Sequence, residues 1–125
     1  MGILSTLFGP SRTVLPTPIR DMAAFRAEVL DSDVPVIVDV WSESCAPCRQ
    51  LAPVLTDVAT RHEGRVRVAE VSADSEPALI SGLRVRATPT LIIFDRGEEV
   101  GRVSGFRPRS WFDEMIEAEF PVVVA

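Results

Sequence analysis

Apolar residues along this chain alternate between two spacings. A nearly continuous β-branched run over 34–40 (Val-Pro-Val-Ile-Val-Asp-Val) is typical of a central strand covered on both faces. Apolar positions over 48–62 recur at helical spacing, which predicts an amphipathic helix. Pro53 lies inside that helix and is expected to bend it, because proline lacks a backbone donor.

Similar patterns predict the other elements. They are a helix over 21–30 with Asp21 as its N-cap, a strand over 66–71, a short helix over 76–81 closed by Gly82, strands over 91–94 and 99–103 joined by a hairpin, and a helix over 110–119. Alternating strands and helices favour parallel pairing, and the late hairpin adds an antiparallel pair. The sequence therefore predicts an α/β fold, with a central mixed β-sheet of four to five strands flanked by helices on both faces.

One domain accounts for nearly all of the 125 residues. Prolines interrupt residues 1–18, which we interpret as a lead-in with a possible short edge strand. The domain is expected over 19–120, and residues 121–125 form a short apolar tail.

Composition excludes several classes of function. The net charge of −5 argues against a nucleic-acid partner, and no apolar run is long enough to predict a membrane span. The first eight residues lack the positive charge and cleavage site of a secretory signal, so we expect a cytoplasmic location. All basic side chains are arginines, which excludes lysine nucleophiles.

The two cysteines, Cys45 and Cys48, are the candidate chemical centre. They follow the predicted central strand and open a helix, and Pro47 suits the first turn of that helix. A helix N-terminus favours the thiolate of the first cysteine, and two intervening residues allow a disulfide to the second. The spacing predicts a redox-active pair. A zinc site would need more ligands than the chain offers, where only His62 adds to the pair. Two cysteines that merely pack are the other alternative.

Several residues together resemble the thioredoxin family. The segment 38–53 reads Val-Asp-Val-Trp-Ser-Glu-Ser-Cys-Ala-Pro-Cys-Arg-Gln-Leu-Ala-Pro, and a Thr-Pro-Thr-Leu stretch follows at 88–91. Gly97 and Gly105 flank the last predicted strand, as in that family. The similarity extends over roughly residues 19–120 and implies the thioredoxin fold.

The resemblance implies a role for each matching residue. Cys45 would be the nucleophile and Cys48 the resolving thiol. Pro89 would be a cis-proline facing the disulfide, where the backbone of Thr88 pairs with an extended substrate; the alternative is an ordinary trans proline. The residues implied at the substrate contact are Trp41, Ala46, Pro47, Thr88, Pro89 and Gly105.

Asp39 is an acid inside the apolar strand. Burial without a partner is costly for a carboxylate, so its pKa should be raised. In the family the matching acid moves protons to and from the resolving thiol, whereas a satisfied structural acid is the alternative here.

Three positions depart from the family pattern. Ser44 stands where a second Trp is usual, which suggests a weaker or different substrate preference. Ala46 replaces the usual Gly between the cysteines. Glu70 stands where a Lys is usual, close to the buried acid. Glu70 could face Asp39 and couple to its titration, be neutralised by an Arg, or point to solvent.

These observations predict a thiol-disulfide oxidoreductase that reduces protein disulfides through Cys45 and Cys48. We expect no bound cofactor and no metal; an external donor, such as a flavin-dependent thioredoxin reductase, would restore the dithiol. Disulfide-containing proteins would be the substrates, and the chain is expected to be a monomer or weak dimer. The alternatives are a disulfide oxidase or isomerase, and a binding or chaperone module with regulatory cysteines.

Overall fold

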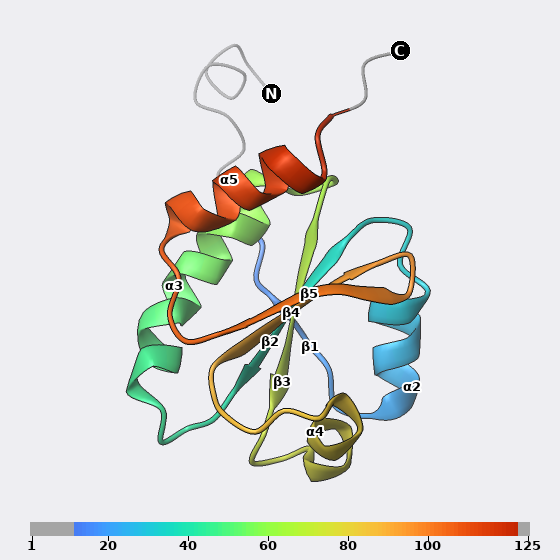
Figure 1. Ribbon diagram of the computed structural model, residues 1–125, viewed down its shortest axis with the longest axis vertical. Helices are drawn as coiled ribbons and strands as arrows, with labels where there is room; N and C mark the ends of the chain where they lie inside the picture. The colour runs from blue at the N-terminus through green and yellow to red at the C-terminus, as the bar shows by residue number, and fades with distance from the viewer. Residues whose placement is uncertain (1–11, 123–125) are drawn as a thin grey trace.

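A five-stranded sheet forms the centre of the computed structural model, which describes residues 12–122 (Figure 1). Its order is β1-β3-β2-β4-β5, with β1, β3 and β2 parallel and β4 and β5 antiparallel. The strands are β1 (Thr17–Pro18), β2 (Val36–Trp41), β3 (Arg67–Ser72), β4 (Thr90–Asp95) and β5 (Glu98–Ser104). The predicted mixed sheet is confirmed.

Helices cover both faces of this sheet (Figure 1). They are α2 (Met22–Phe25), which continues as the π-helical segment η1 (Arg26–Leu30), α3 (Ala46–Arg61), α4 (Pro77–Leu83) and α5 (Arg109–Glu119). One buried cluster joins α2, η1 and α4 to the sheet, and a second joins α3 and α5 to its other face. Successive side chains of a strand point to opposite faces. The apolar run of β2 therefore supplies Val36, Val38 and Val40 to the first cluster and Ile37 to the second.

The end of helix α4 differs from the prediction. Helix α4 continues through Gly82, and Arg84 adopts the left-handed conformation at its C-cap, with φ 57°. The prediction of Gly82 as the closing residue is wrong, because here an arginine takes the conformation that usually favours glycine. Helix α3 begins directly after Cys45 with Pro47 in its first turn, as predicted, and it continues through Pro53, since the buried side of the helix outweighs the loss of one backbone bond.

The hairpin between β4 and β5 requires its glycine. Gly97 has φ 82°, and a Cβ at this position would lie 3.0 Å from the carbonyl oxygen of Leu30. A side chain would therefore collide with the end of η1 as well as strain the turn.

Strand β1 lies within the predicted lead-in and pairs with β3 at the edge of the sheet. Most of the lead-in and the last three residues of the apolar tail lie outside the described residues. Among residues 12–122, no helix has the length and apolar character needed to cross a bilayer.

Candidate active site

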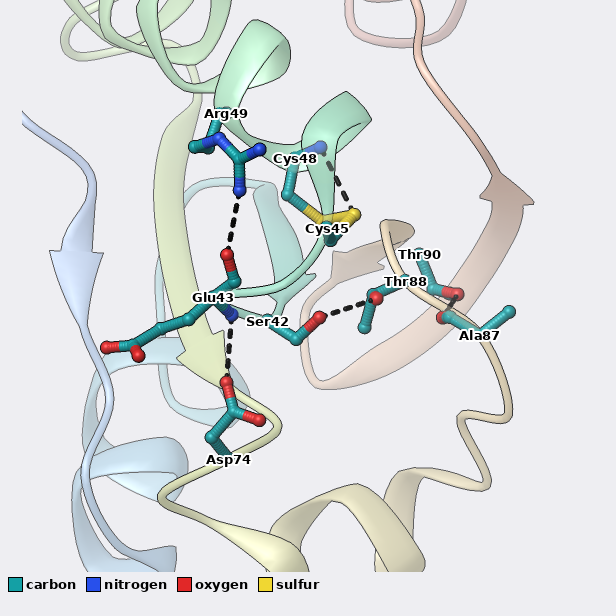
Figure 2. Close-up of a disulfide and its surroundings, with 9 residues drawn as sticks. All are labelled: Ser42, Glu43, Cys45, Cys48, Arg49, Asp74, Ala87, Thr88 and Thr90. Carbon is teal, nitrogen blue, oxygen red and sulfur yellow. Dashed lines mark hydrogen bonds between the residues drawn. A yellow bond between two sulfur atoms is a disulfide. The ribbon is translucent and has the colours of Figure 1, made fainter.

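Cys45 and Cys48 form a disulfide where the loop after β2 enters α3 (Figure 2). Cys45 is the N-cap of the helix, and the two Cα atoms are 5.2 Å apart. The backbone N–H of Cys48 donates a hydrogen bond to Sγ of Cys45, with an N···S distance of 3.2 Å. The first turn of α3 therefore directs a donor at the first sulfur.

This geometry distinguishes the two sulfurs chemically. The backbone N–H of Cys48 and the positive end of the helix stabilise a thiolate at Cys45 once the disulfide is reduced. Cys45 is 9% exposed and Cys48 is 4% exposed, and the intervening Ala46 and Pro47 lie on the surface. An incoming disulfide can therefore reach Cys45 more readily than Cys48.

Three hydrogen bonds anchor the loop that carries Cys45 (Figure 2). Asp74, in the loop after β3, accepts from the backbone N–H of Glu43 at 2.9 Å. The guanidinium of Arg49 donates to the carbonyl of Glu43 at 2.8 Å. The hydroxyls of Ser42 and Thr88 are 2.9 Å apart and hydrogen-bonded. Sequence reasoning missed this anchoring, because Glu43 and Asp74 are 31 residues apart and carry no local pattern.

Thr88 and Pro89 directly precede β4 and lie beside this loop. The peptide bond between them is cis, as the sequence predicted. The backbone N–H of Gly105, at φ 90°, donates to the carbonyl of Pro89 at 2.9 Å, and Thr90 Oγ1 donates to the carbonyl of Ala87 at 2.6 Å. The segments at Pro89 and Gly105 are therefore hydrogen-bonded to each other next to the loop of residues 42–45, which we call the redox loop.

Asp39 lies on β2 and is 4% exposed. Burial, and secondarily the negative charge of Glu70, raise the pKa of its carboxyl group from an ordinary 3.8 to about 7. Its Oδ1 atom has no hydrogen-bond partner among the described residues. Burial thus accounts for the raised pKa that the sequence predicted, and the described residues do not provide the partner that a satisfied structural acid would have at Oδ1.

Glu70 pairs in register with Asp39 across the parallel strands β3 and β2, so both side chains are on the same face. Glu70 is half-buried, and burial raises its pKa while the charge of Arg20 acts in the opposite direction. Both carboxyl groups, Cys48 and Trp41 line one cavity of about 300 Å³. Of the three arrangements that the sequence left open, Glu70 faces Asp39, and Arg20 compensates part of its charge.

The described residues offer no further ligands for a zinc site at the cysteine pair. Both cysteine sulfurs are engaged in the disulfide, and within residues 12–122 no three His, Cys, Asp or Glu side chains are grouped to hold a metal. His62 instead bonds Asp113 at 2.7 Å, between the end of α3 and α5.

Comparison with known proteins agrees with this geometry. A thioredoxin family model matches residues 17–118. Thioredoxin 1 of Nostoc sp. is 42% identical over 95 residues, covering 76% of this chain and 89% of the relative. Thioredoxin of Synechocystis sp. is 39% identical over 101 residues, covering 81% and 94%. The solved structure of a mutant thioredoxin from Halobacterium salinarum NRC-1 superposes with a TM-score of 0.78 at 27% identity, covering 94% of this chain and all of that one.

The predicted fold and its central chemistry are therefore confirmed. The matches extend over nearly all of the described residues, and the cysteine pair stands at disulfide distance. This chain belongs to the thioredoxin family of thiol-disulfide oxidoreductases.

Proposed function

We propose that this protein is a protein-disulfide reductase. The observation that carries the proposal is the Cys45–Cys48 pair at the N-terminus of α3, with the Cys48 N–H aimed at Cys45 Sγ. A stabilised thiolate at the first cysteine and a shielded second thiol are the two groups that dithiol–disulfide exchange needs.

The reaction proceeds in two displacements. The Cys45 thiolate attacks one sulfur of the substrate disulfide, forming a mixed disulfide and releasing the other substrate sulfur as a thiolate. Cys48 then loses its proton and attacks Cys45 Sγ, which forms the intramolecular disulfide and expels the second substrate thiolate. The substrate gains two electrons and two protons, and the protein becomes oxidised.

Asp39 is the proposed acceptor of the Cys48 proton. Its carboxyl group lines the same cavity as Cys48, and a pKa of about 7 suits a group that gains and loses a proton near neutral pH. It acts as a base in the second displacement and as an acid when the disulfide is reduced again.

The substrate is proposed to bind as an extended chain across the redox loop. Ala46 and Pro47 are exposed beside the disulfide, and the joined segments at Pro89 and Gly105 border the same loop. Thr88 offers backbone groups for pairing with the substrate, and Trp41 lines the cavity beside Cys48.

The dithiol is proposed to be restored by an external reductase, such as a flavin-dependent thioredoxin reductase. The protein itself needs no bound cofactor for the two displacements, because the cysteine pair carries both electrons. We place this cycle in the cytoplasm, where a reducing glutathione poise maintains thiols, and expect a monomer or weak dimer.

The test is the reduction potential of the Cys45–Cys48 couple, followed by thiol labelling across defined dithiothreitol and glutathione buffers. A reductase should give a value of about −250 mV or lower, near the thioredoxin value of about −270 mV. A value above about −200 mV would assign the protein to the oxidases or isomerases. Failure to form the disulfide in oxidising buffer would favour a binding module.

A further inference from the structure

Two carboxyl groups, and not one, line the cavity beside the resolving cysteine. Asp39 and Glu70 are register partners on adjacent parallel strands, and both contribute to the cavity that Cys48 also lines. Asp39 is almost fully buried with its Oδ1 unpartnered among residues 12–122, whereas Glu70 is half-buried. The pair therefore runs from the protein interior towards the surface.

Glu70 also borders a second cavity, of about 210 Å³. Arg20, Ser72, Ser75 and Glu76 line this second cavity and do not border the first. Glu70, together with Trp41 and Glu43, therefore borders both the cavity that contains Cys48 and the second cavity, which is lined mainly by polar residues. Each cavity has space for several water molecules, since one occupies about 30 Å³ in the liquid.

We propose that Glu70 is a proton-relay residue: the proton that Cys48 gives to Asp39 leaves the buried site for solvent through the Glu70 carboxyl group. This inference rests on the proposed reductase chemistry and adds a step to it. When Cys48 attacks Cys45 Sγ, its S–H proton passes to the Asp39 carboxylate; Glu70 then accepts that proton and releases it to water. The reverse order applies when the disulfide is reduced.

The charges around Glu70 are compatible with this role. Burial, and secondarily the charge of Glu70, raise the pKa of Asp39, whereas burial raises the pKa of Glu70 and the charge of Arg20 after β1 lowers it. Arg49 lines the cavity that contains Cys48, Glu76 before α4 lines the second cavity, and Glu43 lines both. Two facing carboxylates repel each other. The pair therefore binds its first proton more tightly than an isolated carboxylate would. A proton gained by Asp39 can therefore move to Glu70 without leaving two ionised acids in the cavity.

The experiment follows the Cys48 step alone. Reduced protein is mixed with 5,5′-dithiobis(2-nitrobenzoate) between pH 5 and 9, and thionitrobenzoate release is recorded in a stopped-flow instrument. The first equivalent reports attack by Cys45, and the second, concentration-independent phase reports attack by Cys48. The variant is Glu70→Gln, and the control is Glu98→Gln, which removes the same charge from an exposed position of the same sheet.

In Glu70→Gln we expect two changes in the second phase. Its acid limb should move to lower pH, because the pKa of Asp39 falls when the neighbouring charge is removed. Its plateau rate should fall roughly tenfold, less than the 10²- to 10⁴-fold typical of a group that transfers the proton in the transition state itself. Added imidazole, a mobile proton carrier, should restore the plateau, and Glu98→Gln should match the wild type.

Two results would overturn the inference. One is an unchanged second phase in Glu70→Gln. The other is a shifted acid limb with an unchanged plateau rate, which would mean that Glu70 alters the pKa of Asp39 but does not transfer its proton. Carbon-13 titration of Asp39 in the same variant shows that the protein is folded and measures the shift directly. Wild-type protein that releases only one equivalent would contradict the reductase proposal and this inference together.

Discussion

The two faces of the sheet bury different kinds of side chain, although β2 supplies both. Towards α2, η1 and α4 this strand presents Val36, Val38 and Val40, which join a cluster of apolar residues. Towards α3 it presents Ile37, Asp39 and Trp41, so the apolar packing gives way to a carboxyl group and a cavity. The first face stabilises the fold, and the second accepts a buried acid at some cost in stability.

The face towards α3 also carries an apolar cluster, but Asp39 and Glu70 lie beside that cluster, so we call it the polar face. It is the face on which the reactive groups converge. Helix α3 has the disulfide at its first turn, and at its far end its C-cap His62 bonds Asp113 of α5. The side chains of Asp39 on β2 and Glu70 on β3 line the cavity that Cys48 of α3 also lines. A single alternation of side chains along one strand thus separates packing from chemistry, and substitutions on the two faces should affect different properties.

The largest effect is expected from Cys45→Ser, which removes the nucleophile. Disulfide reduction should fall by roughly 10³-fold or more, because no other thiol of the chain is placed to make the first attack. The measurement is reduction of insulin disulfides coupled to a thioredoxin reductase. Cys48→Ser is the matched variant and should accumulate a mixed disulfide through Cys45. Retained activity in Cys45→Ser would show that the polar face does not act through this pair.

The next effect is expected from Asp39→Asn and depends on pH. The folded protein holds the Asp39 proton up to a pKa of about 7, while the unfolded chain releases it near 3.8. The wild type therefore loses stability as the pH rises through this window, by about 4 kcal/mol at 1.36 kcal/mol per pH unit. The variant lacks this loss, so it should be more stable at pH 8 by up to that amount and nearly equal at pH 4.

Guanidinium unfolding of the oxidised protein at pH 4, 5.5 and 8 measures this difference. Equal stability of the variant and the wild type at pH 8 would mean that Asp39 is ionised at little cost, and the contrast between the two faces would lose its main support.

A smaller effect is expected from Val38→Ala on the apolar face. Val38 is fully buried, and removing two methyl groups should cost about 2 kcal/mol of unfolding free energy through lost burial and a cavity. Because no titratable group is involved, the loss should be the same at pH 4 and pH 8. The same denaturation series tests it, and a strong pH dependence would show that the two faces are coupled.

The smallest effect is expected from Ser42→Ala, which removes the hydroxyl bonded to Thr88 at 2.9 Å. The hydrogen bond is partly buried, so its loss should cost about 1 kcal/mol. Thermal unfolding at pH 7 gives the stability, and the insulin assay gives the activity. A rise in KM with little change in kcat would show that this bond sharpens substrate binding at the redox loop.

The sequence predicted the elements that depend on local patterns. The β-branched run at 34–40, the cysteine pair before a helix and the hairpin with Gly97 each follow from neighbouring residues. Arrangements that depend on distant residues were not predictable in the same way. The Glu43–Asp74 hydrogen bond and the position of Glu70 opposite Asp39 follow from strand register, which no short segment encodes.

Asp39 also changes how the charge of the whole protein should be counted. The formal net charge of −5 treats every carboxyl group as ionised. With a pKa of about 7 for Asp39, roughly half of the folded molecules at pH 7 carry one negative charge fewer. Electrophoretic mobility of the native protein should therefore decrease from pH 8 to pH 6 more than that of Asp39→Asn. Bulk electrophoresis thus reports the protonation of a side chain that solvent scarcely touches.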